Sequence, residues 1–325
     1  MNKKKIIIIL GQTATGKSDF AVETSRVLAV SGVESEIISA DSRQVYKGMD
    51  LGTGKITRKE MKGVRHHLLD VTSPSKPAST QGGVFSVNDF QKLASKKIEE
   101  ILAKNKTPIV CGGTGFYIDT LINQTSLPEV PPNKKLRAKL EKESTEKLFV
   151  MLKKIDPERA KNIDPKNKVR LIRAIEIAKA LGQVPSLHRS DLCNYIGQTY
   201  ATCDKYSVLK IGLTLPPEIL KERIKTRLLS RIKKGMIKEI ENLHKQGVSW
   251  KRMHQFGLEY RHVSLFLQGK LSKSEMIEKL NTDIWHFAKR QKTWFKRDPN
   301  IIWLDPTKKS AKLKALKKIK EFLKS

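Results

Sequence analysis

The stretch that most constrains this chain is a phosphate-binding loop near its start, Gly11 to Ser18, with the sequence GQTATGKS. Glycine, four residues, glycine, lysine and serine follow one another in the order that phosphate loops require. The apolar run of residues 6–10 precedes the loop, and apolar residues recur at helical spacing from Phe20 to Leu28. A strand, a glycine turn and a helix start therefore coincide, which aims backbone N–H groups and the helix dipole at phosphate oxygens. The sequence predicts a phosphate-bearing substrate.

Cationic and hydroxyl side chains are expected to act on that substrate. Lys17 would neutralise its terminal phosphate, and the Ser18 hydroxyl would be a ligand of Mg²⁺. On a later predicted helix, Arg223 and Arg227 lie four residues apart and share one face. Such a pair suits a diphosphate, because guanidinium groups bind phosphate oxygens through paired hydrogen bonds.

Short β-branched runs alternate with helical patterns, which is typical of an α/β fold with a parallel sheet. After the first strand, the sequence predicts strands at residues 36–40, 66–71, 107–111, 207–215 and 301–305. Asp41 follows the second strand and Gly112-Gly113-Thr114 follows the fourth, at the edge where such sheets bind ligands. An ATP-hydrolysing protein usually needs an acidic residue after the fourth strand, so the glycines argue against ATPases and helicases. We predict a phosphate-loop NTPase-like core with a parallel sheet flanked by helices.

Composition changes after the fourth strand, where charged, helix-forming residues dominate. Helices are predicted there at residues 134–142, 148–155 and 170–178. Arg170 and Arg173 can line one face of the third helix. This face suits a phosphate backbone, although an ordinary amphipathic bundle with solvated lysines fits the same pattern. We expect an inserted all-helical domain at residues 119–195, and an α/β core with C-terminal helices at residues 1–118 and 196–325.

The balance of charge indicates a polyanionic partner. With 64 Lys and Arg against 33 Asp and Glu, the formal net charge is +31. Nucleic acid is the first candidate, and a basic surface that is merely solvated is the alternative. Aromatic and basic residues also mix between Trp285 and Arg297, as they do in many nucleic-acid contacts.

The remaining composition indicates a cytoplasmic protein. Three scattered cysteines without C-x-x-C spacing suggest a reducing compartment and no zinc site. No apolar run approaches the length of about 18 residues that a membrane-spanning helix needs. We therefore expect no membrane partner.

Taken together, these motifs resemble those of the tRNA isopentenyltransferase family, the tRNA dimethylallyltransferases, over nearly the whole chain. The resemblance rests on six stretches, which are the phosphate loop, Asp41–Gly54, His66–Asp70, Gly112–Tyr117, Arg170–Arg173 and Lys289–Trp294. A phosphate loop alone is nonspecific. The loop followed by the Asp41 stretch and then by Gly112–Tyr117 is highly specific.

The resemblance implies transfer of a dimethylallyl group from dimethylallyl diphosphate to the N6 amine of the adenosine just 3′ of the anticodon. It assigns the proton of that amine to Asp41 and the orientation of the amine to Thr114. Arg227, with Arg223 and Lys17, would stabilise the diphosphate. The implied cofactor is Mg²⁺ on Ser18, and the implied partner is the anticodon stem-loop of tRNA, gripped by the helical insertion. We expect a monomer.

The resemblance also implies two sets of binding residues. Its diphosphate-binding residues are Gly11, Gln12, Thr13, Ala14, Thr15, Gly16, Lys17, Ser18 and Arg223. Its tRNA-binding residues are Asp41, Ser42, Arg43, Gln44, Thr114, Arg137, Val169, Arg170, Leu171, Ile172 and Arg173. The chain departs from the family at Gln12, where proline is common. It departs again at Glu259, in Phe256–Arg261, where a glycine is expected.

Two other enzyme classes share parts of this pattern. An adenylate isopentenyltransferase would use the same fold and donor but modify free AMP, ADP or ATP; the helical insertion and the charge of +31 favour tRNA. A small-molecule kinase would hold ATP in the phosphate loop, and Lys221–Lys234 could imitate its arginine-rich lid. The Asp41 stretch and the Gly112-Gly113-Thr114 turn argue against a kinase. They also argue, with Lys17, against an RNA-binding protein without activity.

Overall fold

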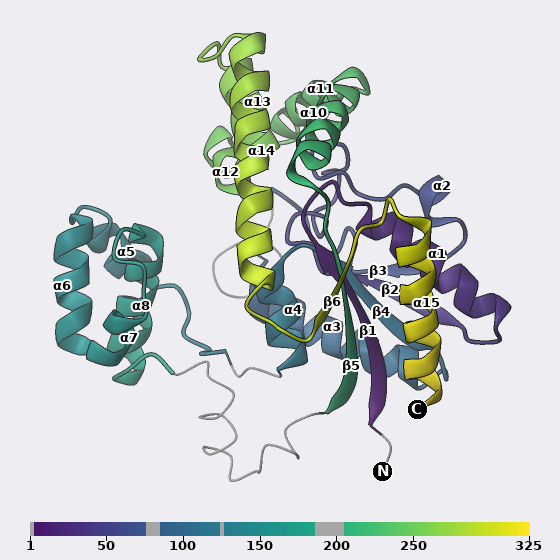
Figure 1. Ribbon diagram of the computed structural model, residues 1–325. Coiled ribbons are helices and arrows are strands. Elements are labelled where there is room, and N and C mark those ends of the chain that lie inside the picture. Colours follow the sequence, from purple (N-terminus) through teal and green to yellow (C-terminus); the bar gives the residue numbers. More distant parts are fainter. Residues whose placement is uncertain (1–2, 76–84, 124–126, 186–204) are drawn as a thin grey trace. The chain divides into compact units, whose positions relative to one another are not determined.

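The computed structural model describes residues 3–75, 85–123, 127–185 and 205–325 (Figure 1). The chain divides into two compact units. The first comprises residues 1–78, 85–122 and 204–325, and the second comprises residues 79–84 and 123–203. Each unit is built around cores of its own, and we describe them separately.

The first unit is organised around a six-stranded sheet in the order β3-β2-β4-β1-β5-β6. Every neighbouring pair of these strands is parallel. The strands are β1 (Lys4–Gly11), β2 (Ser35–Ser39), β3 (His66–His67), β4 (Thr107–Gly112), β5 (Tyr206–Leu213) and β6 (Ile301–Leu304). The predicted α/β fold with a parallel sheet flanked by helices is confirmed. Because β1 lies between β4 and β5, the phosphate loop that follows it emerges in the middle of the sheet.

The two faces of the sheet carry different helices, as Figure 1 shows. Odd-numbered residues of β1 such as Ile7 pack with α1 (Lys17–Val30) and α15 (Lys309–Lys324). Even-numbered residues such as Ile8 pack with α3 (Val87–Leu102) and α4 (Gly115–Ile122). Successive strand residues point to opposite faces, so the apolar residues 6–10 of β1 are buried on both sides.

A group of helices follows β5 and forms a third apolar cluster of the same unit. It consists of α10 (Pro217–Lys233), α11 (Met236–Lys245), α12 (Trp250–Phe256), α13 (Leu258–Leu267) and α14 (Lys273–Phe295). Val45, Tyr46 and Met49, from the loop after β2, are buried in this cluster. That loop is therefore held between the sheet and the helices.

The second unit is helical wherever it is described. It contains α5 (Lys134–Leu140), α6 (Thr145–Ile155), α7 (Pro157–Lys161) and α8 (Lys168–Leu181). Side-chain oxygens of Asn133, Ser144, Asp156 and Asn167 accept hydrogen bonds from the first turns of these helices. Such caps fix the start of short helices. The apolar faces meet in a separate core around Leu148, Leu152, Leu171 and Ile175.

Two expectations about boundaries need comment. The third strand, predicted over residues 66–71, is wrong in length, because β3 ends at His67. Leu68 and Asp70 have positive φ angles of 62° and 56°, which no strand tolerates. The predicted domain boundaries stay a prediction: residue 118 lies inside α4, and residues 195–196 lie outside the described residues. No described helix is both long and apolar enough to span a membrane.

Candidate active site

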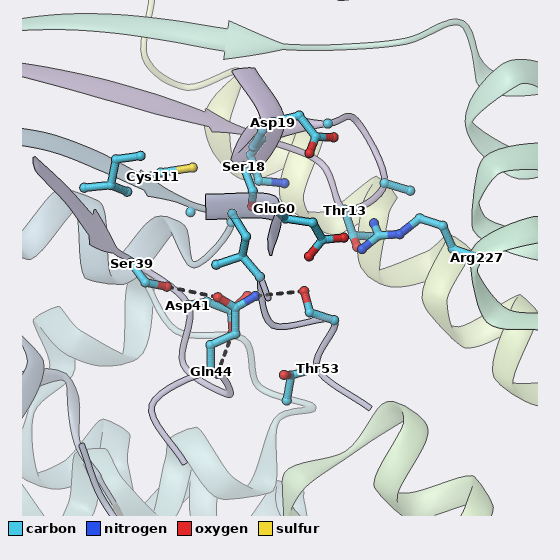
Figure 2. A pocket seen from close by; sticks show the side chains of 18 of the residues that line it. Thr13, Ser18, Asp19, Ser39, Asp41, Gln44, Thr53, Glu60, Cys111 and Arg227 are labelled. Carbon is cyan, nitrogen blue, oxygen red and sulfur yellow. Dashed lines mark hydrogen bonds between the residues drawn. The ribbon is translucent and has the colours of Figure 1, made fainter. Parts of the chain in front are cut away.

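A pocket of about 430 Å³ opens beside the phosphate loop. Figure 2 shows side chains that line it, among them Thr13, Asp41 and Arg227. Thr13 and Lys17 belong to the phosphate loop, and Asp41 belongs to the loop after β2. Gly112 and Gly113 come from the end of β4, and Arg223 and Arg227 from α10. The pocket thus joins most of the residues that the sequence assigns to the diphosphate and to catalysis.

The shape of the phosphate loop depends on two glycines. Gly11 has a φ angle of 139°, and a Cβ atom there would lie 2.3 Å from the carbonyl oxygen of Leu213 on β5. Gly16 has a φ angle of 85° and occupies the N-cap position of α1. Only glycine adopts these angles without strain, so the loop bends where its N–H groups can meet an anion.

Lys17 opens α1 and lines the pocket. Its Nζ atom donates a hydrogen bond to the carbonyl oxygen of Gln12 at 2.5 Å. Burial and the positive charge of Arg227 lower the pKa of Lys17 from 10.5 to about 8, against the opposing effects of Cys111 and Asp41. Because this ammonium faces the pocket, it is placed to bind an anion there.

Asp41 and Thr114 are connected through the backbone of residue 42. The Asp41 Oδ1 atom accepts hydrogen bonds from the backbone nitrogens of Arg43 at 2.8 Å and Gln44 at 3.3 Å. The Ser42 backbone nitrogen donates to the Thr114 hydroxyl at 3.1 Å. The family resemblance implies that both side chains act on the same amine, and this hydrogen bond places Thr114 beside the backbone that follows Asp41.

Gly112 makes this approach possible. The backbone nitrogen of Ala40 donates to the carbonyl oxygen of Cys111 at 2.8 Å, and that of Thr114 donates to the Ala40 carbonyl oxygen at 3.2 Å. A Cβ atom on Gly112 would lie 2.2 Å from the same Ala40 oxygen. Any side chain at this position would push the end of β4 away from the end of β2, and with it Thr114 from Asp41.

Arg223 and Arg227 line the pocket together, as their spacing predicts. Figure 2 shows Arg227 reaching from α10 towards Thr13 and Glu60. Burial, followed by the neighbouring charge of Arg231, lowers the pKa of Arg227 from 12.5 to about 10. The guanidinium remains charged at neutral pH, so it can attract an anion that enters the pocket.

Gln291, on α14, is a positioning residue that our reading of the sequence missed. Its Oε1 atom accepts from the Thr13 backbone nitrogen at 2.8 Å, and its Nε2 atom donates to the Gly113 carbonyl oxygen at 2.8 Å. The Gln12 Nε2 atom donates to the carbonyl oxygen of Ala288 on the same helix at 3.1 Å. One face of α14 therefore fixes both the phosphate loop and the turn after β4.

We expect Gln291→Ala to destabilise the protein by about 1–3 kcal/mol, because it leaves a buried N–H and a buried carbonyl unpaired. It should also weaken binding of an anion such as inorganic diphosphate, because Gln291 holds the phosphate loop in place. Urea unfolding and calorimetry measure the two effects. Arg290→Ala is the matched control, since Arg290 is exposed on the same helix, and it should change the unfolding free energy by less than about 0.5 kcal/mol. Equal unfolding curves for Gln291→Ala and wild type would contradict the assignment.

His66 and Glu60 also line the pocket. The His66 Nδ1 atom lies 2.8 Å from the Val64 carbonyl oxygen, which makes Nδ1 the protonated nitrogen. Burial lowers the pKa of His66, and its buried Nε2 atom has no partner among the described residues. Its Nε2 atom is therefore a neutral hydrogen-bond acceptor.

The chain is similar to known proteins in sequence and in structure. Residues 44–298 match the sequence model of the family described as IPP transferase, which covers well over half of the chain. The chain belongs to the IPP transferase family. Among its relatives, tRNA dimethylallyltransferase 2 of Treponema denticola is 43% identical over 297 residues, or 91% of this chain and 93% of that protein. The tRNA dimethylallyltransferase of Acetivibrio thermocellus is 36% identical over 322 residues, or 98% and 97% of the two chains.

Solved structures agree with this membership. The tRNA isopentenylpyrophosphate transferase of Bacillus halodurans superimposes with a TM-score of 0.70 at 32% identity, over 99% of this chain and 97% of that one. A eukaryotic dimethylallyltransferase acting on tRNA superimposes with a TM-score of 0.71 at 25% identity, over 93% of this chain and 74% of that one.

Within this IPP transferase, the residues expected to contact tRNA lie in both units. In the first unit, the Arg43 Nε atom donates to the carbonyl oxygen of Phe256 at 2.8 Å, and the Gln44 amide lies between Ser39 and Gly54 (Figure 2). These contacts order the loop after β2. Ser42 and Thr114 are joined as described above.

In the second unit, buried Glu176 organises two of the expected tRNA-binding arginines. Its carboxylate accepts from Arg137 at 2.7 Å and from Arg173 at 2.5 Å. Leu171 is fully buried and Ile172 is 7% exposed, so their side chains belong to the core of the unit. Val169, which is 77% exposed, presents its side chain to solvent.

Two stretches of the first unit of this IPP transferase carry residues that are packed inside the protein. The aromatic and basic stretch from Trp285 to Arg297 is not simply a surface for nucleic acid: Gln291 is buried, and the Trp294 Nε1 atom donates to Asp119 at 2.7 Å. Glu259, where the resemblance expects glycine, is buried and forms an ion pair with Arg231 at 3.1 Å. Gln291 and Glu259 thus make contacts within the protein.

Proposed function

We propose that this protein transfers a dimethylallyl group from dimethylallyl diphosphate to the N6 amine of the adenosine 3′ of the anticodon in tRNA, with release of diphosphate. One observation carries the proposal. A single pocket combines an anion-binding phosphate loop, two arginines of α10 and Asp41, with Thr114 joined to Asp41 through Ser42. The names of the relatives support the same reaction.

In the proposed reaction, the N6 nitrogen forms a bond to the first carbon of the dimethylallyl group while the bond from that carbon to the diphosphate oxygen breaks. An aryl amine is a weak nucleophile, so a base beside it helps; the amine proton passes to the Asp41 carboxylate. Thr114 orients the amine through its hydroxyl. The two backbone N–H groups on Asp41 Oδ1 hold that carboxylate in position.

Negative charge builds on the diphosphate as it leaves. Lys17 and Arg227 both line the pocket, and their surroundings lower the pKa of each, so an approaching anion gains electrostatic interaction with both cations. Arg223 extends this wall of the pocket. These residues support a role for the phosphate loop in binding the diphosphate of the donor.

Mg²⁺ is the cofactor that we propose for this site. The Ser18 hydroxyl lines the pocket beside Lys17, and the described residues contain no cluster of three His, Cys, Asp or Glu side chains that could hold a metal by themselves. Mg²⁺ typically keeps several waters and shares its site with substrate phosphates, so one hydroxyl suits it. When bound, the ion would neutralise charge on the diphosphate.

We expect removal of Mg²⁺ with EDTA to abolish transfer, and excess Mg²⁺ to restore it. Ser18→Ala should raise the Mg²⁺ concentration needed for half-maximal binding of dimethylallyl diphosphate by about tenfold, while Ser18→Thr, which keeps the hydroxyl, should not. Calorimetric titration of the diphosphate at several Mg²⁺ concentrations gives this readout without turnover. Binding that ignores Mg²⁺ would contradict the assignment.

The polyanionic partner is proposed to be the anticodon stem-loop. The net charge of +31 supplies the long-range attraction, and exposed residues of the helical unit, such as Arg170 and Val169, are proposed to contact the RNA. The adenine must leave its stack to enter a pocket of this size, as substrates of other base-modifying enzymes do. Such a reaction belongs in the cytoplasm, and a monomer suffices for it.

Transfer of labelled dimethylallyl groups tests the proposal. Unmodified anticodon stem-loop, AMP and ATP serve as parallel acceptors, and label should enter only the stem-loop. A stem-loop with guanosine in place of the acceptor adenosine is the control and should stay unlabelled. Label on the free nucleotides would identify an adenylate isopentenyltransferase instead. Consumption of ATP without any transfer would overturn prenyl transfer and favour a kinase.

A further inference from the structure

The ion pair between Arg231 on α10 and Glu259 on α13 lies next to the pocket but does not line it. The Nη1–Oε1 distance is 3.1 Å, and the two side chains are only 15% and 12% exposed. An ion pair this buried contributes little stability compared with apolar side chains of similar size. Its presence beside the pocket therefore calls for another explanation.

Arg231 follows Arg227 by one turn of α10, so two guanidinium groups lie side by side. Both press against Gly54, which lines the pocket: a Cβ atom there would lie 1.9 Å from Nη2 of Arg231 and 3.0 Å from Nη2 of Arg227. Like charges at this spacing repel each other. No hydrogen bond or ion pair engages Arg227 within the described ranges, whereas Arg231 has a carboxylate partner.

We propose that Glu259 is a positioning residue of the diphosphate site: it binds the Arg231 guanidinium, balances its charge and keeps it out of the pocket, so that Arg227 alone of these two arginines meets the diphosphate. This inference rests on the proposed function, in which the diphosphate lies between the phosphate loop and α10. Without Glu259, Arg231 would be an uncompensated cation beside Arg227.

The charges around the pair support this assignment. Burial raises the pKa of Glu259, and the positive charges of Arg231 and then Arg227 act against that rise. Burial and then Arg231 lower the pKa of Arg227, while Glu259 counteracts them. The carboxylate therefore acts on both arginines, although it contacts only Arg231. Its removal should increase the positive potential at the phosphate site, and removal of Arg231 should decrease it.

This reasoning predicts opposite effects for two single substitutions. Glu259→Gln keeps the size of the side chain but leaves Arg231 uncompensated, so inorganic diphosphate should bind about three- to tenfold more tightly and kcat should fall because product leaves slowly. Arg231→Met leaves the Glu259 carboxylate to attract Arg227, so diphosphate should bind about three- to tenfold more weakly. Arg231→Met/Glu259→Gln removes both charges and should return the affinity to within about twofold of wild type.

Calorimetry with inorganic diphosphate and Mg²⁺ measures these affinities without any transfer. A pair that only supports folding would give weaker binding in both single variants and no recovery in the double variant, and that pattern would overturn the inference. If Glu259→Gln does not fold, the comparison of Arg231→Met with the double variant decides alone: equal affinities contradict the proposal. A wild-type protein that binds no diphosphate or transfers no label would instead refute the proposed function.

Discussion

Asp41→Ala should lower the rate of dimethylallyl transfer to the stem-loop by about 10²–10⁴-fold, the contribution typical of a positioned general base. The carboxylate follows β2 and accepts two backbone N–H groups through Oδ1, which leaves Oδ2 as the oxygen that can take the amine proton. Dimethylallyl diphosphate should bind almost as well as to wild type, because the phosphate loop and α10 are unchanged. Single-turnover transfer and calorimetry separate the two effects.

Asp41→Asn is the matched variant for this experiment. Its amide oxygen can still accept from the backbone nitrogens of Arg43 and Gln44, so the turn after β2 should keep its shape. The amide cannot accept a proton at neutral pH, so the transfer rate should fall as it does in Asp41→Ala. If Asp41→Asn kept the wild-type rate, Asp41 would only order the loop, and another group would have to take the proton.

Much of the core could be predicted because its signals are local. β-Branched runs mark buried parallel strands, and the phosphate loop places glycine where only glycine tolerates the backbone angles and the contact with Leu213. The third strand was predicted too long because nothing in the sequence HHLLDV at residues 66–71 indicates that Leu68 turns into the left-handed region. That turn brings Asp70 to within 2.5 Å of Lys55, a contact made across 15 residues.

The residues that hold the site in place could not be predicted, because they lie far from it along the chain. Gln291 contacts Thr13 across 278 residues, and its helical surroundings resemble a basic, aromatic surface. Glu239 on α11 accepts the backbone N–H groups of Asp50, Leu51 and Gly52 at 2.6–3.1 Å, which fixes the loop that carries Thr53 and Gly54 into the pocket. Glu239 lies in no motif. Gln291 lies in the Lys289–Trp294 stretch of the family resemblance, but nothing in that stretch indicates that its amide contacts the phosphate loop.

The positive charge of the helical unit did not show which of its arginines bind an acidic residue inside the protein. Arg137 and Arg173 fit a basic surface by sequence, yet both bind the buried carboxylate of Glu176. Two arginines on one carboxylate leave an excess positive charge that RNA can still meet, but their geometry is set by the core of the helical unit. A basic residue in a helix can thus serve the fold and the ligand together.

The affinity for dimethylallyl diphosphate should fall as pH rises above about 8, because Lys17 loses its proton there in the free protein. The bound diphosphate favours the charged ammonium, so binding is coupled to the uptake of one proton whenever free Lys17 is neutral. Below pH 8 the residue is already charged and affinity should change little. Above it, the dissociation constant should approach a rise of about tenfold per pH unit, the slope of one linked proton.

Lys17→Met provides the control for this pH dependence. It should bind dimethylallyl diphosphate about 10- to 100-fold more weakly at pH 7, because a hydrogen bond to a charged group typically contributes that much to affinity. Its affinity should stay nearly constant up to pH 9. Arg227, whose pKa is about 10, remains charged over this range and cannot produce the change. Calorimetry at fixed Mg²⁺ and ionic strength measures the affinity of each protein as a function of pH. If the two affinities changed in parallel, Lys17 would not titrate in this range, and another group would have to stabilise its charge before the substrate binds.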